Sequence, residues 1–208
     1  MNALAAHSLA DIPVFRAAQL KAGPGGGAWR WENLVGALSE ISEEAPSGAL
    51  SFVTEIIAAA QGQNDPVAWV AGTQSIFFPP DLMKRGIDLS ALAVIRAGAD
   101  ADSLTAAEWL VRSGAFGLVI IDCEGAWSVS DGLLGRIQKL AERNVCAVVF
   151  LTRKRPSEPS LGSRISLRGC ITRTHAEPLA IAIDTIKDKK SNSRSRQGRK
   201  YNGPSGMY

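Results

Sequence analysis

Short apolar stretches alternate along this chain with segments in which apolar residues recur at helical spacing, and this alternation constrains the fold more than any other feature. The stretches 118–121 and 147–150 contain no polar residue, which is typical of strands that helices cover on both faces. Strands that alternate with helices form mostly parallel sheets. The sequence therefore predicts an α/β fold with a mostly parallel central sheet flanked by helices. The predicted strands of this part are 37–41, 67–70, 92–95, 118–121 and 145–151.

Three segments between these strands carry an apolar face at helical period, and each is predicted to be an amphipathic helix. Thr105 and Glu108 match a Thr-x-x-Glu capping box, so we expect the second helix to begin at Thr105. The apolar faces consist of Phe52, Ile56, Ile57 and Ala60 in the first segment, Leu104, Ala107, Leu110 and Val111 in the second, and Leu133, Leu134, Ile137, Leu140 and Ala141 in the third.

Beyond Arg153 the alternation of strands and helices stops. Residues 153–162 are polar and contain two prolines, which predicts a loop. Three further strand-like segments follow, at 165–167, 170–174 and 179–186, and no room is left for helices between them. We therefore expect these strands to pair antiparallel at one edge of the sheet.

The two ends of the chain differ from this core. Residues 1–28 combine scattered apolar residues with the glycine-rich run 23–27, which predicts a short N-terminal arm and a flexible hinge. Residues 191–208 contain almost nothing that could be buried, so a disordered basic tail is predicted there. A single domain is expected at 29–190, which suits a chain of 208 residues.

Positive charge is concentrated near the C-terminus. Between residues 187 and 200, seven basic residues accompany one acid, a local net charge of +6, whereas residues 1–186 carry a net charge of −3. Such a patch suits DNA, because each neutralised phosphate releases counterions, but a protein partner and simple solubility are alternatives. A second cluster at 153–155 is interpreted as a solvated loop. The basic residues near the C-terminus are Lys187, Lys189, Lys190, Arg194, Arg196, Arg199 and Lys200.

Several classes of site find no support in the composition. Cys123, Cys146 and Cys170 are odd in number and form no Cys-x-x-Cys pair, so we expect reduced, mostly buried thiols. His7 and His175 are too isolated for a metal site or a catalytic triad. No apolar run approaches the roughly 18 residues that cross a bilayer, and the N-terminal residues lack a signal-peptide pattern. A soluble, cytoplasmic protein without a membrane partner is expected.

Five tryptophans are many for a chain of this size. We expect Trp69 and Trp109 to lie in the core or at its edge, where a large indole stabilises packing. Trp29 and Trp31 are expected to pack on their own domain, and a docking surface for another protein is the alternative.

The segment between the first predicted strand and the first predicted helix occupies the place of a phosphate-binding P-loop, with the pattern Gly-x-x-x-x-Gly-Lys-Ser/Thr. Only the second glycine, Gly48, is retained in this degenerate P-loop. Glu43 stands at the first glycine, Ala49 at the lysine that reaches the phosphates, and Leu50 at the magnesium ligand. Carboxylates would repel a triphosphate, so we expect no cofactor and no ATPase activity.

These residues carry a resemblance to known proteins. The segment 40–61 resembles the ATP-binding region of RecA recombinases, and 107–122 resembles the RecA segment that ends in the Walker B aspartate, here Asp122. The segment 36–41 and the overall size most resemble the ImuA family, short RecA-like proteins of bacterial DNA damage-inducible mutagenesis cassettes. The resemblance covers residues 29–190 and implies a RecA-like fold. For Asp122, hydrogen bonding within a loop is the alternative to a ligand contact.

The resemblance also implies a function. Members of the ImuA family would serve error-prone translesion synthesis in the SOS response as non-catalytic accessory proteins, contacting RecA, the Y-family-like protein ImuB and an error-prone polymerase subunit. Two alternatives stay open at this point. One is a cell-division inhibitor of the SulA type, which is also RecA-like without a P-loop, and the other is a divergent DNA-dependent ATPase that uses Asp122. Thr73 stands where the water-activating glutamate of RecA is expected, which argues against the ATPase.

Overall fold

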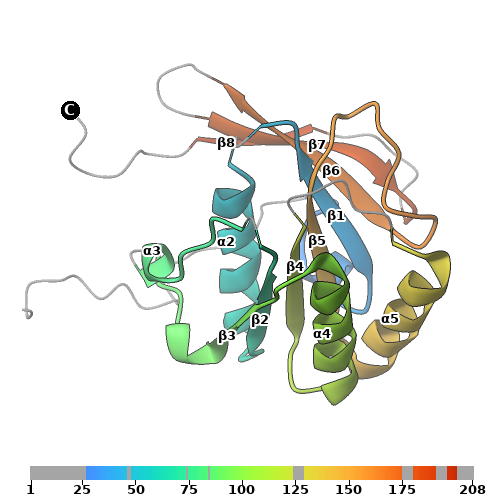
Figure 1. The fold of residues 1–208 in the computed structure, drawn as a ribbon. Helices are drawn as coiled ribbons and strands as arrows, with labels where there is room; N and C mark the ends of the chain where they lie inside the picture. The colour runs from blue at the N-terminus through green and yellow to red at the C-terminus, as the bar shows by residue number, and fades with distance from the viewer. Residues whose placement is uncertain are drawn as a thin grey trace, which may run out of the picture.

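The computed structural model describes residues 27–45, 48–73, 75–83, 85–123, 129–174, 180–190 and 196–200. Most of the predicted arm and hinge, both histidines and residues 201–208 lie outside these ranges. Within them the chain forms an α/β fold, as predicted, with a sheet that is mostly parallel and helices on both of its faces (Figure 1). Residues 29–190 contribute all of the helices in the described ranges and the first seven strands.

The described strands form a single eight-stranded sheet in the order β3-β2-β4-β5-β1-β6-β7-β8. All pairs from β3 to β6 are parallel, whereas β6-β7 and β7-β8 are antiparallel. The antiparallel part at one edge was expected, but β6 itself runs parallel to β1. The strands are β1 (Leu38–Glu43), β2 (Val67–Ala71), β3 (Leu92–Arg96), β4 (Leu118–Cys123), β5 (Ala147–Arg153), β6 (Leu167–Thr174), β7 (Ala180–Asp188) and β8 (Arg196–Lys200).

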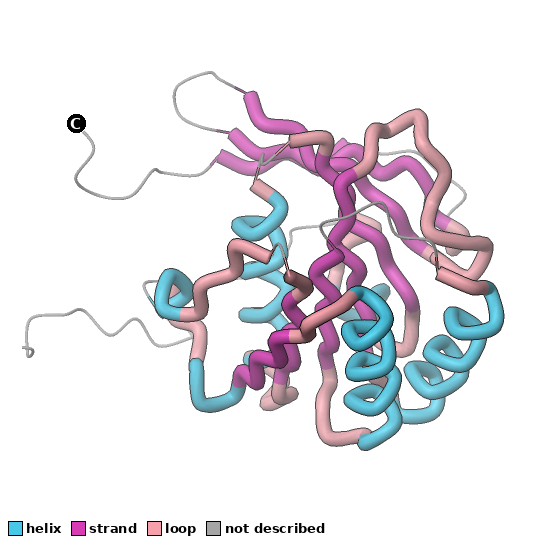
Figure 2. The backbone as a smooth tube through the Cα atoms, viewed as in Figure 1, coloured by secondary structure: helices cyan, strands magenta, loops and turns pink. Residues whose placement is uncertain are grey.

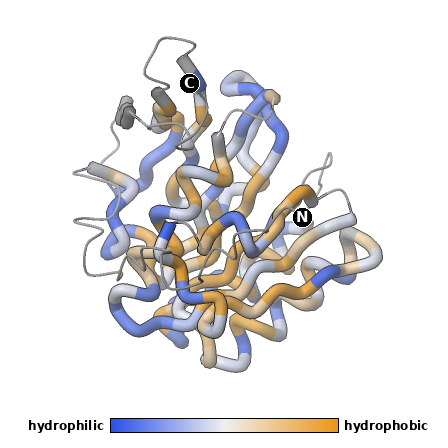
Figure 3. The backbone as a smooth tube through the Cα atoms, turned by 90° about the vertical axis from the view of Figure 1, so that its left-hand side faces the viewer, coloured by the Kyte–Doolittle hydropathy of each residue, from blue (hydrophilic) through white to orange (hydrophobic). Residues whose placement is uncertain are grey.

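The sheet separates two apolar cores. α2 covers one face, and α4 and α5 cover the other (Figures 1 and 2). Neighbouring residues of β2 alternate between them, since Trp69 packs towards α2 and Val70 towards α4 and α5. Apolar residues accordingly gather along the central strands, coloured orange in Figure 3. The helices are α1 (Trp31–Leu34), α2 (Ala49–Gln61), α3 (Pro80–Met83), the 3-10 helix η3 (Leu89–Ala91), α4 (Asp100–Ser113) and α5 (Asp131–Asn144).

The start that was predicted for the second helix is wrong. α4 begins at Asp100, five residues before Thr105. The Thr105 hydroxyl donates to the carbonyl of Ala101 inside the helix, and Glu108 pairs with Arg112 on the same helix and with Arg136 on α5. Glu108 therefore serves the contact between α4 and α5, and the Thr105/Glu108 pair does not cap a helix.

The prediction of a disordered tail is wrong for five of its residues. Arg196–Lys200 form β8, which pairs with β7 over the register from Ala180 to Asp184. Strand formation here needs no apolar side chain, because β7 supplies backbone partners along its edge. The remaining tail residues, 191–195 and 201–208, lie outside the described part of the chain.

Three of the tryptophan predictions are confirmed and one is wrong, since the partly buried Trp31 also packs against the core of its own domain. Trp69 is buried, and Trp29 is fully buried on its own domain, where its indole N–H donates to the Thr185 hydroxyl at 3.1 Å. Trp109, however, is 73% exposed on α4. Among the described cysteine side chains, Cys146 and Cys170 are buried free thiols, as predicted.

No helix within the described ranges combines the length and apolar character needed to cross a membrane.

Candidate functional site

The strand β1 leads directly into the head of α2, the position of the degenerate P-loop. Gly48 is the N-cap residue and has φ of 126°, a value that favours glycine. It also lies directly under β7, because a Cβ at this position would be 2.5 Å from Ile181 Cδ1. Ala49 is buried and Leu50 packs against the core on the α2 side. The retained glycine therefore serves close packing of β7 on the helix head.

The Glu43 carboxylate is bound to the head of α2. Its Oε2 atom accepts a hydrogen bond from the backbone N–H of Ala49 at 3.1 Å. The first N–H groups of a helix have no partner within the helix and carry partial positive charge, which is why phosphates bind there. In this chain a side chain of the protein itself supplies the anion. A phosphate bound there would have to displace the Glu43 carboxylate from Ala49 N–H and would remain close to the negative charge of that carboxylate.

The aspartate near the end of β4 holds a loop. Asp122 is buried, and its Oδ2 atom accepts a hydrogen bond from the Ser75 hydroxyl at 2.5 Å. The same hydroxyl accepts from the backbone N–H of Phe77 at 3.2 Å, and the Asp122 carbonyl accepts from Gly72. Asp122 thereby fixes the segment that follows β2. This arrangement matches the loop hydrogen bonding that was the alternative to a ligand contact.

The segment after β2 also fills space on the α2 side of the sheet. The ring of Phe77 stacks on that of Trp69, with centroids 3.7 Å apart and planes at 5°. Phe78 next to it is 57% exposed, and Thr73, at the position of the expected glutamate, is exposed as well. The described part of this segment thus places an aromatic stack, and no carboxylate, next to Asp122.

Three of the seven basic residues predicted to contact DNA or a partner are engaged within the domain. The Lys187 ammonium donates to the Ser160 hydroxyl and to the Gly162 carbonyl, both at 3.3 Å. Burial, followed by the neighbouring charge of Lys189, lowers the pKa of Lys187. Lys189 and Lys190 donate to the carbonyls of Ser163 and Asn33. Arg196, Arg199 and Lys200 lie in β8, and Arg194 is outside the described residues.

Sequence reasoning missed a buried charged cluster centred on Glu40 of β1. The Glu40 side chain is fully buried, and Oε1 accepts from the Thr152 hydroxyl at 3.0 Å. Lys154 lies 3.4 Å from Oε1, and the equally buried Arg168 of β6 lies 3.9 Å from Oε2. The backbone N–H of Leu161 also donates to Oε2, at 2.9 Å. One carboxylate therefore ties two strands and a loop together.

The loop at 154–166 closes the sheet face beside α5, where it runs past β6 (Figure 2). The Arg168 guanidinium donates to the carbonyls of Glu158 and Arg155 in this loop. Arg155 in turn pairs with Glu44 at 3.1 Å on the surface. The interpretation of 153–155 as a solvated basic loop is therefore wrong for Lys154, which neutralises a buried carboxylate. A charged residue inside an apolar strand was the available signal, but its partners are remote in sequence.

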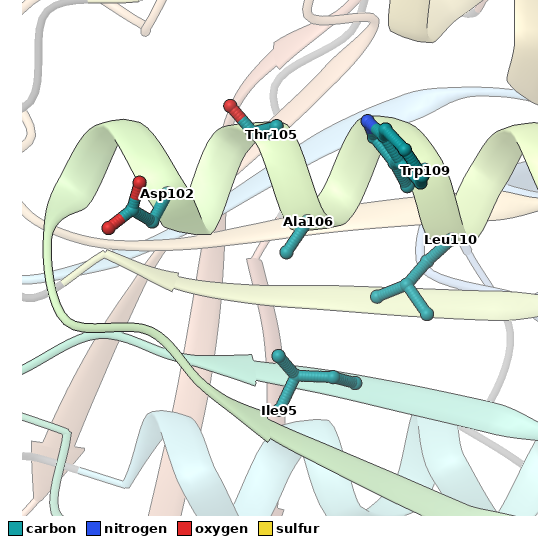
Figure 4. Close-up of a pocket in the computed structure, with 6 residues that line it drawn as sticks. All are labelled: Ile95, Asp102, Thr105, Ala106, Trp109 and Leu110. Carbon is teal, nitrogen blue, oxygen red and sulfur yellow. The ribbon is translucent and has the colours of Figure 1, made fainter.

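An apolar groove lies at the opposite edge of the sheet, between β3 and α4 (Figure 4). Ile95 forms its floor, with Ala106 and Leu110 from the helix, and Asp102 and Thr105 lie towards one end. The exposed Trp109 indole completes the lining, and the volume is about 400 Å³.

No family model matches the chain. It is similar to the protein RecA of Chlorobium limicola, with 32% identity over 91 residues, which are 44% of this chain and 26% of that RecA. The RecA of Chlorobaculum tepidum is 33% identical over 91 residues, which are again 44% of this chain and 26% of that RecA. The match spans about a quarter of the length of these relatives. The chain thus has a distant, RecA-like relationship over part of its length.

Proposed function

We propose that this protein is a non-catalytic, RecA-like accessory factor of error-prone translesion DNA synthesis, which acts in the cytoplasm through contacts with other proteins. The observation that carries the proposal is the Glu43 carboxylate on the head of α2, because it takes the position that a nucleotide phosphate would need. The similarity to RecA supports a role beside RecA. The ImuB-type partner and the polymerase subunit follow from the resemblance to the ImuA family.

The physical argument concerns charge at the helix head. A phosphate within about 4 Å of the Glu43 carboxylate would be repelled by about 4 kcal/mol at an effective dielectric constant of 20. The helix dipole contributes only about 0.3 to 1 kcal/mol in favour of an anion, and Glu43 already uses it. Ala49 and Leu50 supply neither a cation nor a magnesium ligand. Repulsion outweighs attraction, which disfavours the divergent ATPase.

The mechanism that we propose is capping of RecA filaments. A subunit that associates with RecA on one surface, but cannot bind ATP, would stop the filament from extending past it. The contact surface that we assign to RecA is the groove between β3 and α4, where Trp109 offers an exposed anchor. Aromatic anchors in apolar surroundings commonly dominate protein interfaces.

Binding of nucleotide tests the first half of the proposal. We expect a fluorescent ATP analogue with Mg²⁺ to show no saturable binding, while RecA titrated in parallel serves as the positive control. Micromolar binding that magnesium strengthens would contradict the proposal and favour the ATPase.

Filament length tests the second half. RecA filaments on single-stranded DNA should become shorter when this protein is added, and Trp109→Ala should lose the effect. Met83→Ala removes another exposed apolar side chain, from α3, and should keep the effect. Unchanged filament length with the wild-type protein would refute capping. A pull-down that recovers the tubulin-like division protein and no mutagenesis protein would favour the SulA-type alternative.

A further inference from the structure

Two cationic side chains stand opposite each other in the antiparallel pair of β6 and β7. Arg168 of β6 is the direct partner of Lys187 of β7 in the register. Like charges in opposite positions of a sheet destabilise it, and Arg168 is buried as well. Natural sequences break such a local rule mainly at functional sites. The pair therefore marks a candidate site away from the head of α2.

Lys187 has hydrogen-bond acceptors but no counter-charge of its own. Its ammonium donates to the Ser160 hydroxyl and to the Gly162 carbonyl, both at 3.3 Å. The buried Glu40 carboxylate is already paired with two other cations. Among the described residues, no carboxylate oxygen lies within ion-pair distance of Lys187. Its nitrogen is thus held by neutral oxygens in a positively charged neighbourhood.

These surroundings favour the uncharged form of the nitrogen. Burial lowers the pKa of Lys187, the charges of Lys189 and Arg168 add to the shift, and Glu40 opposes it. An uncharged lysine amine has a free electron pair and acts as a nucleophile. The charged groups on the elements around the nitrogen are Arg168 on β6, Glu40 on β1, Lys189 next to β7, Lys154 at the start of the loop and Asp131 at the start of α5.

We propose that Lys187 is an acyl-acceptor site, which takes an acyl group on its side-chain nitrogen from an acyl phosphate. The neighbouring cations attract the phosphate of such a donor. The electron pair of the amine attacks the carbonyl carbon, the bond from that carbon to the phosphate oxygen breaks, and phosphate leaves with the electron pair. The nitrogen passes its surplus proton through the Ser160 hydroxyl to water, and a neutral amide remains.

Acetyl phosphate is the probe, and mass spectrometry measures the initial rate of acetylation at each lysine of the full-length protein at neutral pH. Lys139 on α5 is the internal reference, because it is exposed. We expect Lys187 to react about tenfold or more faster than Lys139, since surrounding cations concentrate an anionic donor. This advantage should shrink as the pH approaches the ordinary lysine pKa of 10.5, where the reference lysine also loses its proton.

An uncharged donor provides the matched probe. The ester para-nitrophenyl acetate transfers the same acetyl group but carries no phosphate. With this donor the ratio of the rates at Lys187 and Lys139 should fall by about threefold or more, because the cations no longer attract the donor.

Two serines of the loop provide a matched pair of variants. Ser160→Ala removes the hydroxyl that accepts from Lys187, and it should slow acetylation of Lys187 about tenfold. Ser163→Ala alters an exposed serine of the same loop, and acetylation of Lys187 should proceed as in the wild type.

Three results would overturn the inference. They are acetylation of Lys187 no faster than that of Lys139, the same ratio of rates with the uncharged donor, and equal effects of the two serine variants. The first two comparisons leave the protein unaltered, so they stay decisive even where a variant disturbs the loop. The inference goes beyond the proposed accessory function, and its failure would leave the nucleotide and filament tests untouched.

Discussion

Glu40 and Ile41 are neighbours in β1, both fully buried, and they face opposite sides of the sheet. On the Ile41 side a helix, α2, closes the sheet with an apolar face. On the Glu40 side, beside α5, a loop closes it, and the loop is held by hydrogen bonds and ion pairs to Glu40 and Arg168. A helix buries enough apolar area to be held by non-directional packing, whereas a polar loop is held in place by specific hydrogen bonds and ion pairs.

The largest loss of stability is expected from a substitution on the charged side of the sheet, at Glu40. Glu40→Gln keeps the shape of the side chain but leaves the buried Arg168 and the adjacent Lys154 without their counter-charge. Removing one partner of a buried ion pair costs about 3 to 5 kcal/mol, so we expect a loss of that size in the free energy of unfolding, measured with urea.

The double variant Glu40→Leu with Arg168→Met is the control for this comparison. Replacing both members of a buried pair by apolar residues is often neutral or stabilising, so it should recover most of the loss. A double variant as unstable as Glu40→Gln would mean that the hydrogen bonds to Thr152 and Leu161, and not the charge, hold the loop.

On the apolar side of the sheet, stability should depend on the volume of the Ile41 side chain. Ile41→Ala is expected to cost about 2 to 5 kcal/mol, and the smaller truncation Ile41→Val about 0.5 to 1.5 kcal/mol. Both losses should be insensitive to salt, since no charge is involved. Urea titrations at low and high salt provide the measurement, and equal losses for the two variants would contradict simple packing against α2.

A smaller effect concerns the last residue of the strand, Glu43. Glu43→Ala removes the acceptor for Ala49 N–H, and loss of a helix cap costs about 0.5 to 2 kcal/mol. Glu43→Gln keeps an acceptor oxygen and should cost less. Thermal unfolding of both variants measures the difference, and a Glu43→Gln variant as unstable as Glu43→Ala would point to charge at the helix head as the dominant contribution.

The smallest effect is a pH dependence on the loop side. Burial lowers the pKa of Lys187, the charge of Lys189 adds to this, and Glu40 partly opposes it. The unfolded chain therefore holds this proton to higher pH than the folded protein does, so stability should rise with pH below the ordinary lysine pKa of 10.5. The free energy of unfolding of the wild type, relative to Lys187→Met, should increase from neutral pH to about pH 10. A decrease would show that the partly buried ammonium is stabilised by its partners.

The apolar side of this comparison was predictable from the sequence. The faces at Phe52, Ile56, Ile57 and Ala60 are buried as predicted, because helical and strand periods are local properties of the chain. The charged side was not predictable, since Glu40 meets Arg168 through strand pairing across more than a hundred residues of sequence. Nothing local in a single sequence indicates such a partner.

The candidate site was likewise predictable from the sequence only in part. The sequence alone shows that Ala49 and Leu50 stand in place of the lysine and the magnesium ligand. The hydrogen bond from Ala49 N–H to the Glu43 carboxylate could not be predicted, because the direction of this side chain depends on how β1 enters α2. The strand character of Arg196–Lys200 was hidden for a related reason, since β7 induces it and the residues themselves do not favour it.

The position of Ile181 limits what substitutions within the loop alone can achieve. Its side chain comes from β7, far along the sequence, and rests on Gly48. Mutations confined to the loop could restore a lysine and a threonine, yet the space above the glycine would still be taken by a residue from another strand. Building a phosphate-binding loop here would therefore require simultaneous changes at two places far apart in the sequence, the loop and β7.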